Sequence, residues 1–517
     1  MDKPYTTQQS LPQYPESLWR ATTDLPAFQR LAEDIDTDVA VVGAGITGIM
    51  TAHLLAKQGK QVVLLDAGRI LDGTTGFTTA KVTAQHGMIY HELMQHFGEE
   101  KARHYYDANV KAMDFIRQQV KEWDIDCGLE KEDAYIYTQD DERRSKLEDE
   151  FKAYEKMGIP GEWLESVPLP LPVRGAIKMP GQYRFHPLVY LKRMVEEFLK
   201  LGGVIYENTT IDEKAETEGP IKLTTKRGNH SITCQFAVSA SHFPFYDGKG
   251  LYFTRLHVER SYAVAVKPET GYPGGMYINI DAPSRSLRSV SYNGEELIIV
   301  GGESHPTGKS ECTHRHYENL EKFAGELLGA RSIPFRWSAQ DLITLDKLPY
   351  IGPITSKQDR ILVATGYRKW GMTTGTVAAK IITDQIMGKD NPYSELFTPS
   401  RFQADPALKT FVVQNAGVAK NFIAGKFDMT HRNIDELKAD EGMVVRHNGQ
   451  RSGAYKDAQG NLFLVDTTCT HLGCETEWNE GERSWDCPCH GSRFKYDGEV
   501  LEGPAIEPLK KLDPHGD

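Results

Sequence analysis

Short apolar runs separated by stretches of helical spacing set the pattern of this chain. Residues 39–42 (VAVV), 62–65 (VVLL) and 361–364 (ILVA) are apolar throughout. Runs of this length are typical of strands that are buried on both faces of a parallel sheet. A helical stretch that ends at Gln58 connects the first two runs, and another is expected from Val377 to Ile386. The pattern therefore predicts an α/β unit.

Between the second and third runs, helical and strand-like patterns alternate. Helical spacing occupies about 98–122, 140–157 and 188–201, and strand-like runs occupy 236–240, 262–267, 275–280 and 297–300. Mixed elements of this kind predict an α+β subdomain that is inserted into the α/β unit.

Composition narrows the possible partners. The chain of 517 residues has room for about three domains. Its 72 acidic and 60 basic residues give a net charge of -12, which argues against a nucleic-acid partner. No stretch reaches the 18 consecutive apolar residues of a membrane span, and the first residues do not resemble a signal peptide. We expect a cytoplasmic protein.

A glycine motif follows the first apolar run directly. In Gly43-Ala44-Gly45-Ile46-Thr47-Gly48, the first glycine permits a tight turn, the second lets backbone approach a pyrophosphate, and the third lets helix pack on strand. Asp66 ends the second run, where a carboxylate can accept a hydrogen bond from a ribose hydroxyl. The spacing predicts dinucleotide binding and leaves FAD and NAD open.

A loop rich in small and hydroxyl-bearing residues follows Asp66 and favours FAD. Its candidate cofactor contacts are Ala67, Gly68, Arg69, Thr74, Thr75, Gly76, Thr79, Ala80, Lys81 and Val82. A buried pyrophosphate and isoalloxazine need close backbone and hydroxyl donors, whereas a plain NAD domain has little use for such a loop. An ordinary turn-rich connection is the alternative interpretation.

Two cysteine and histidine pairs lie near the C-terminus, Cys469 with His471 and Cys487 with His490. Two thiolates and two imidazoles suit a [2Fe–2S] cluster with cysteines on one iron and histidines on the other, which raises the reduction potential. Zinc takes the same ligand types in a tetrahedron, so ligand type alone leaves it as the alternative.

Around these ligands, residues 431–517 resemble the Rieske proteins of cytochrome bc complexes. The matching segments are Cys469–Cys474, Cys487–Ser492, Asp497-Gly498 and Gly503-Pro504-Ala505. The resemblance implies an all-β domain with Cys469, His471, Cys487 and His490 as ligands of a [2Fe–2S] cluster, and a disulfide between Cys474 and Cys489. A disulfide is unusual in reducing cytosol, so this one is expected to be buried and low in potential, or open in the cell.

One departure from the resembled Rieske proteins concerns the cluster potential. Their second loop carries a serine and, two residues later, a tyrosine, and both donate hydrogen bonds to the cluster sulfurs. This chain has Ser492 but Phe494, and Tyr496 is out of register. The missing donor predicts a lower reduction potential.

The late apolar run leads into a second glycine segment, residues 366–375 (GYRKWGMTTG). Together with the first motif, it makes residues 36–400 resemble the D-amino acid oxidase and glycine oxidase family of FAD enzymes. The resemblance implies further FAD contacts at Ile211, Ala240, Gly366, Gly371, Met372, Thr373 and Thr374.

The predicted fold is an α/β FAD-binding, Rossmann-like domain with an α+β substrate subdomain, plus a C-terminal all-β Rieske domain. Residues 1–35 form an arm, 36–405 the FAD-dependent domain, 406–430 a connection and 431–517 the Rieske domain. FAD-binding segments are expected at about 36–90, 200–245 and 340–390. The whole arrangement resembles bacterial proteins of the YhfW type.

The substrate motif departs from the family pattern at Asp341. Many members of the FAD family have an arginine five residues before the aspartate that corresponds to Asp346, and it pairs with a substrate carboxylate. Here that position is Asp341, so the charge that would hold an anion is reversed. An amine or another cation is then favoured as substrate, unless the register differs and Asp341 is structural.

The two centres together predict a dehydrogenase. A flavin accepts two electrons and a cluster carries one, so a small amine or amino-acid-like substrate would reduce FAD, and the cluster would pass electrons to an external acceptor protein or a quinone-type acceptor. One alternative is an NAD(P)H-dependent FAD/Rieske reductase, but Ile299–Glu303 lacks the pattern of a second dinucleotide motif. The other is a non-catalytic redox sensor or electron carrier. No catalytic base can be named.

Some residues copy functional motifs without completing them. Cys312-Thr313-His314 repeats the first half of a Rieske loop, and Glu311, His314 and His316 could be imagined as a mononuclear iron site. We expect solvated side chains there. His186 and residues 255–257 could line a substrate pocket, although structural roles are favoured.

Overall fold

The computed structural model describes residues 15–247, 250–309, 312–401, 407, 410–418, 422 and 432–513. Glu311, most of the expected connection at 406–430 and the first part of the expected arm lie outside these residues. Of the arm, helix α1 (Leu18–Ala21) packs against the first domain: Trp19 is fully buried and its indole N–H donates to Thr78 O at 2.7 Å.

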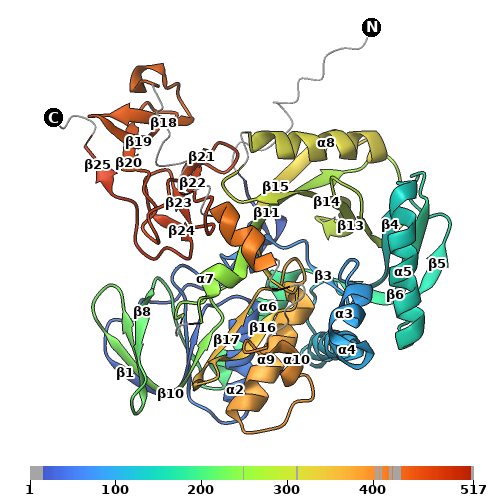
Figure 1. The fold of residues 1–517 in the computed structure, drawn as a ribbon, viewed down its shortest axis with the longest axis horizontal. Helices are drawn as coiled ribbons and strands as arrows, with labels where there is room; N and C mark the ends of the chain where they lie inside the picture. Colours follow the sequence, from blue (N-terminus) through green and yellow to red (C-terminus); the bar gives the residue numbers. More distant parts are fainter. Residues whose placement is uncertain are drawn as a thin grey trace.

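A mainly parallel sheet forms the centre of the first domain (lower left in Figure 1). Its order is β16 (Tyr350–Thr355), β17 (Gln358–Thr365), β10 (Ser231–Ser239), β1 (Ile35–Val42), β2 (Val62–Leu65) and β7 (Val204–Tyr206), with β9 (Ile221–Thr225) and β8 (Ile211–Glu216) continuing from β10. The expected apolar runs are β1, β2 and β17, and they are buried because helices cover the sheet. Parallel pairing brings the carboxyl ends of β1, β2 and β10 to one edge.

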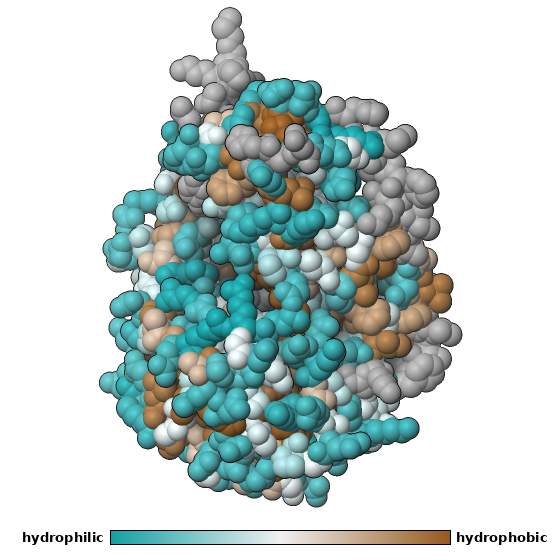
Figure 2. Space-filling model, turned by 90° about the vertical axis from the view of Figure 1, so that its left-hand side faces the viewer, coloured by the Kyte–Doolittle hydropathy of each residue, from teal (hydrophilic) through white to brown (hydrophobic). Residues whose placement is uncertain are grey.

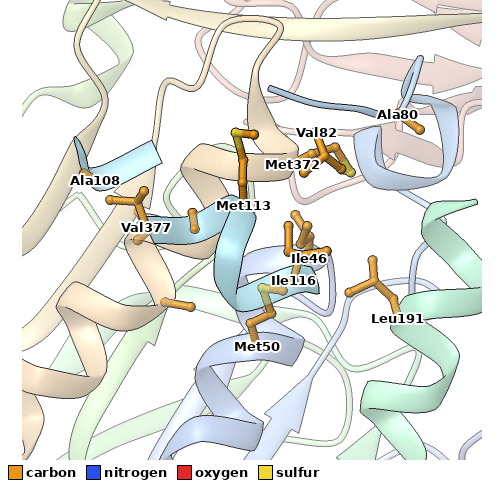
Figure 3. Packing of buried hydrophobic residues seen from close by; sticks show 14 of the residues in the cluster. Ile46, Met50, Ala80, Val82, Ala108, Met113, Ile116, Leu191, Met372 and Val377 are labelled. Carbon is orange, nitrogen blue, oxygen red and sulfur yellow. The ribbon is translucent and has the colours of Figure 1, made fainter. Parts of the chain in front are cut away.

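Three helices pack together against this sheet: α2 (Ile46–Lys57), α6 (Pro187–Lys200) and α9 (Gly371–Ile386). Figure 3 shows Ile46 and Met50 of α2 near Met372 of α9 and Leu191 of α6. Helix α9 begins earlier than the expected Val377, so Gly371 to Thr374 form its first turn rather than a loop. The backbone N–H groups of a first helical turn have no partner within the helix and are free for a ligand.

A second, mixed sheet stands beside the first (right in Figure 1). Its order is β15 (Ser332–Thr344), β11 (Leu256–Lys267), β14 (Glu295–Pro306), β13 (Arg285–Tyr292), β12 (Met276–Asn279), β4 (Glu130–Thr138), β6 (Gly175–Arg184) and β3 (Lys81–Val82), and β5 (Glu162–Leu164) pairs with β6. Helices α3 (Tyr90–Phe97), α4 (Glu99–Glu122), α5 (Asp141–Met157) and α8 (His314–Leu328) flank it. The expected α+β subdomain is confirmed.

The C-terminal unit is built from short antiparallel strands (upper left in Figure 1). One sheet has the order β18 (Glu441–His447), β19 (Gln450–Lys456), β20 (Leu462–Asp466) and β25 (Lys511–Leu512); the other has β21 (Glu477–Asn479), β22 (Ser484–Asp486), β23 (Arg493–Lys495) and β24 (Val500–Glu502). Trp485 is fully buried in its core. The expected all-β class is confirmed.

In Figure 1 the C-terminal unit lies above the first sheet, on the left of the molecule. Figure 2 shows this left-hand side face on, and hydrophilic side chains predominate there. Within the described ranges, no helix combines the length and the apolar character needed to cross a membrane.

Gly48→Ala should destabilise the first domain. A Cβ at Gly48 would lie 1.8 Å from Gly43 O, and overpacking of this kind costs about 1–3 kcal/mol or more. We expect a clearly lower midpoint in urea unfolding. Gly271→Ala is the matched control, since a Cβ there would meet no described atom within 4 Å. Equal midpoints for the two variants would contradict the close packing of α2 on β1.

Candidate functional site

Two tight loops of the C-terminal unit carry the proposed cluster ligands. Cys469 and His471 lie between β20 and β21, and Cys487 and His490 lie between β22 and β23. Each loop turns back on itself: Cys469 N donates to Cys474 O at 2.7 Å, and Cys487 N donates to the carbonyl of the residue five positions later at 2.8 Å. The loops therefore present all four side chains at one end of the unit.

The four side chains have the chemistry of cluster ligands. Cys469 and Cys487 are buried free thiols in hydrogen-bond contact, which lowers the pKa of Cys469. The His471 and His490 rings lie 5.1 Å apart, and burial lowers the pKa of each imidazole to about 4. His471 Nδ1 is buried without a hydrogen-bond partner among the described residues. Two soft thiols, two neutral imidazoles and an unpartnered nitrogen suit a [2Fe–2S] cluster.

The predicted disulfide is present between Cys474 and Cys489. It joins the two loops, and both of its residues are buried. The sulfurs of Cys474, Cys487 and Cys489 lie within 4.8 Å of one another. Since disulfide sulfurs are poor metal ligands, this proximity places the disulfide beside the proposed ligand Cys487 and does not define a separate metal site.

Ser492 and Phe494 occupy the positions that tune the potential in the resembled Rieske proteins. The Ser492 hydroxyl contacts the Cys469 sulfur and accepts a hydrogen bond from Ala505 N at 3.0 Å. Phe494 is fully buried in the same core as the loop cysteines. Tyr496 points elsewhere, since its ring lies 4.8 Å from that of Tyr455. Phe494 therefore places an apolar ring where the resembled Rieske proteins have a tyrosine hydroxyl that donates a hydrogen bond.

A cavity of about 1010 Å³ lies between the two sheets and the C-terminal unit. The predicted FAD residues that line it are Gly43, Gly45, Ile46, Thr47, Asp66, Ala67, Gly68, Arg69, Thr74, Thr75, Thr79, Lys81, Ile211, Ala240, Gly366, Gly371 and Met372. They come from three regions of the chain; most lie at one edge of the first sheet, whereas Lys81 belongs to β3 of the second sheet. This cavity is the candidate FAD site.

The remaining predicted FAD residues lie behind the cavity wall: Ala44, Gly48, Gly76, Ala80, Val82, Thr373 and Thr374. Gly48 and Gly76 are sites of close packing, where a Cβ would meet the carbonyl oxygens of Gly43 and Leu71. The Thr373 hydroxyl bonds to Thr83 O and that of Thr374 to Asn109. The side chains of Thr373 and Thr374 therefore point away from the cavity.

Backbone and carboxylate geometry at the first glycine motif fits a dinucleotide. Gly43 has φ +104°, and a Cβ there would lie 2.5 Å from Ala240 O. Asp66 accepts hydrogen bonds from Ala44 N at 2.7 Å and Gly68 N at 2.8 Å, while burial raises its pKa to about 6. The carboxylate is held at the edge of the cavity, where a ribose hydroxyl can reach it.

Charged groups of both signs line the part of the cavity formed by the second sheet and the segment after β17. Asp341 of β15 accepts a hydrogen bond from Ser261 at 3.1 Å and lies 3.6 Å from Lys369 Nζ. Burial raises the pKa of Asp341 to about 6. Lys81 Nζ donates to Tyr277 O at 3.2 Å, and burial lowers its pKa to about 7. Asp341 therefore lines the cavity, and its neighbour Lys369 is a partner that the sequence did not indicate.

The histidine edge of the C-terminal unit meets the same cavity. His471 and Leu472 line it. The ring of Phe253 lies 6.1 Å from His471 and 5.6 Å from His490. Gln340 Nε2 also donates to Gly491 O in the second cluster loop at 2.9 Å. No local motif signals these contacts, because they join positions that are far apart in the chain.

The incomplete Rieske-like motif contacts the C-terminal unit, so the expectation of solvated side chains is wrong for Thr313, which is buried. Cys312 Sγ donates to Glu480 at 2.9 Å, and Thr313 Oγ1 donates to Asn479 Oδ1 at 2.7 Å. Nearby, His316 lies in the first turn of α8, and its ring contacts the Glu303 carboxylate at 2.9 Å. Among the described residues, only Cys474, Cys487 and Cys489 form a group of three possible metal ligands close enough to share one ion.

The other candidate pocket residues have structural roles. His186 caps α6, accepting from Val189 N at 3.3 Å, and packs on Trp19. Arg255 donates to Pro399 O and lies over the Tyr350 ring. Neither His186 nor residues 255–257 line the cavity.

Comparison with known proteins identifies the class of both parts. A model of FAD dependent oxidoreductases (DAO) matches residues 38–385, and a model of the Rieske [2Fe-2S] domain matches residues 429–513. The chain therefore belongs to the DAO family of FAD dependent oxidoreductases and carries a C-terminal Rieske domain. It binds FAD and a [2Fe–2S] cluster.

Individual relatives agree with this assignment. The chain is 50% identical over 499 residues to the Rieske 2Fe-2S iron-sulfur protein YhfW of Bacillus subtilis (strain 168), covering 96% of this chain and 98% of the relative. It is 24% identical to gamma-glutamylputrescine oxidoreductase of Escherichia coli (strain K12), over 70% of this chain and 86% of the relative. Glycine oxidase from Geobacillus kaustophilus shares the fold of the first part, with a TM-score of 0.60, 18% identity and coverage of 71% of this chain and 99% of that chain.

Cys469→Ser should abolish the cluster, because it removes a thiolate ligand. We expect iron content and the EPR signal of the dithionite-reduced protein to fall to near zero. Cys312→Ser changes the cysteine of the similar Cys-Thr-His triplet and should retain full iron. Iron loss in both variants would refute the ligand assignment.

The cluster potential should follow the hydrogen bonds at its loop. Ser492→Ala removes a donor and is expected to lower the midpoint potential by about 20–60 mV, the equivalent of one modest hydrogen bond. Phe494→Tyr should raise it by a similar amount. Tyr496→Phe is the control and should leave it unchanged in a redox titration. A shift in the control as large as in Ser492→Ala would contradict this account.

Proposed function

We propose that this protein is a dehydrogenase that oxidises a small amine or amino-acid-like substrate and delivers single electrons to an external acceptor. The observation that carries the proposal is that predicted FAD residues and the predicted cluster ligand His471 line one cavity. FAD accepts a hydride as an electron pair, and a Rieske cluster carries electrons one at a time. The chain holds both sites at fixed positions within one cavity.

The protein itself bridges the two sites. Segment 240–243 runs from the end of β10 in the first sheet, where Ala240 lines the cavity, to Phe243, whose ring packs on His471. Gln340 fixes the second cluster loop from the substrate sheet. Electron transfer between the sites then needs no second protein, and this supports a dehydrogenase over an oxidase that uses oxygen. The final acceptor is an electron-transfer protein or a quinone-type molecule.

The charges in the cavity support an amine or amino-acid-like substrate. Asp341 can hold an ammonium group, and the neighbouring Lys369 can hold a carboxylate. The relative gamma-glutamylputrescine oxidoreductase is named for a substrate that carries an amine. Gly301 and Gly302, the remaining candidates for a second dinucleotide turn, lie inside strand β14. That position gives no support to a reductase that would bind NAD(P)H there.

Asp341→Asn should weaken substrate binding. Removal of the negative charge leaves Lys369 facing an ammonium group, so we expect KM for an amine substrate to rise at least about tenfold, the equivalent of one charge-assisted hydrogen bond. FAD content should stay unchanged. Glu259→Gln on the paired strand β11 is the matched control, since Glu259 does not line the cavity. An unchanged KM in Asp341→Asn would remove this carboxylate from the substrate site.

The activity should also depend on pH through Asp341. Burial raises the pKa of this carboxyl to about 6, so its charge is lost as pH falls through that value. We expect kcat/KM for a cationic amine to fall below about pH 6 in the parent protein, and Asp341→Asn to lack this step. The same step in both proteins would assign it to another group.

The experiment that tests the function is an anaerobic titration of the purified protein with NADH and with a panel of amines and amino acids. Flavin absorbance and the EPR signal of the reduced cluster are followed together. The proposal expects an amine to bleach the flavin and raise the cluster signal while NADH does neither. Reduction of both centres by NADH alone would overturn it, and no response to any donor would favour a passive carrier.

A further inference from the structure

The FAD cavity has a second wall that the Rieske domain supplies. Every residue from 499 to 508 lines the cavity, together with Lys495 and Leu472. This stretch, called here the Rieske wall, includes β24 and the segment after it. The stretch is unbroken in the chain. It carries an exposed apolar side chain, Leu501, with 41% of its surface accessible. The DAO domain thus supplies only part of the surface around its own cofactor cavity.

Ion pairs connect the Rieske wall to the DAO domain across the cavity. Lys226 Nζ lies 2.8 Å from Glu507 Oε1, and an Arg227 Nη lies 3.7 Å from a Glu499 carboxylate oxygen. Lys226 and Arg227 line the cavity next to the segment that carries the predicted FAD residue Ile211. Both pairs are half-exposed, so each contributes modestly and is sensitive to salt. They hold the wall beside the predicted FAD-binding segments that line the cavity.

The cluster loops hold the Rieske wall in position. Thr470 Oγ1, between two cluster ligands, donates to Glu507 O at 2.6 Å. Ala505 N donates to Ser492 Oγ at 3.0 Å. The wall is therefore tied at two points to the loops that carry Cys469, His471 and Cys487. Its conformation depends on the Rieske fold rather than on the DAO domain.

We propose that the Rieske wall is part of the FAD-binding site and slows the release of FAD, so that the Rieske domain serves as a cover for the cofactor as well as an electron carrier. FAD would leave only when the wall separates from Lys226 and Arg227. This inference is independent of the proposed substrate, because it concerns retention of FAD and not turnover.

The test joins the Rieske wall covalently to the DAO domain and compares it with an unjoined sample of the same protein that carries the same charge. In a Cys312→Ser background, Lys226→Cys and Glu507→Cys replace the ion pair with two thiols. One half of the sample is cross-linked with a short, flexible bis-maleimide, and the other half is capped with N-ethylmaleimide. Release of FAD from the full-length protein is followed by absorbance of the filtrate after ultrafiltration, and EPR confirms that both samples hold the cluster.

We expect the cross-linked protein to release FAD at least about tenfold more slowly than the capped protein, because the tether keeps the wall at high effective concentration. The capped protein should release FAD about 1.5- to 5-fold faster than the parent, the range for loss of an exposed ion pair. Equal rates in the cross-linked and capped samples would overturn the proposal. Failure of the two thiols to cross-link would also overturn it, since the wall would not face Lys226.

The readout separates this inference from the proposed function. If the protein oxidises no amine but releases FAD slowly when cross-linked, the proposed cover is supported and the proposed dehydrogenase is refuted. If it oxidises an amine but releases FAD at equal rates in both samples, the dehydrogenase is supported and the cover is refuted.

Discussion

A buried charge holds the two domains in one arrangement. Arg260 of the DAO domain is 1% exposed and lies beside Glu482 and Glu502 of the Rieske domain. Burial by itself would raise the pKa of Glu502, yet Arg493 and Arg260 keep it below its usual range. A docking that kept Arg260 buried but turned these carboxylates away would leave an uncompensated buried charge, which is strongly destabilising. Docking is therefore specific in orientation, although such a network adds little net stability.

This orientation turns the cluster loops toward the flavin site. With Arg260 paired, the second loop receives the hydrogen bond from Gln340, and the histidine edge packs on Phe253. The edge of the Rieske domain that carries the imidazoles faces the DAO domain of the same chain. Predicted FAD residues, Asp341, Lys369 and His471 consequently line one cavity, and the Rieske wall forms part of its lining.

Local motifs predicted many residues that line the cavity, and contacts between distant segments account for those that the sequence did not indicate. Gly43, Asp66 and the four proposed cluster ligands could be predicted because the chemistry expected of them depends on short spacings. The helical first turn at Gly371 was not, because its capping groups give no sequence signal. Cys312-Thr313 was expected to be solvated, but it contacts β21 and the turn after it, because the C-terminal unit docks there. Gly503-Pro504-Ala505 of the Rieske wall was noted as a Rieske segment, but its position on the cavity could not be predicted, since that depends on docking against Lys226, far away in the chain.

The central claim is that electrons pass from the flavin site to the cluster within one chain. The most direct measurement is flash photoreduction of the flavin in anaerobic, fully loaded protein, with flavin and cluster absorbance followed in time over a range of protein concentrations. The account predicts that the cluster is reduced as the flavin is reoxidised, with a first-order rate that does not change with concentration. A rate proportional to protein concentration, or a cluster that stays oxidised, would contradict it.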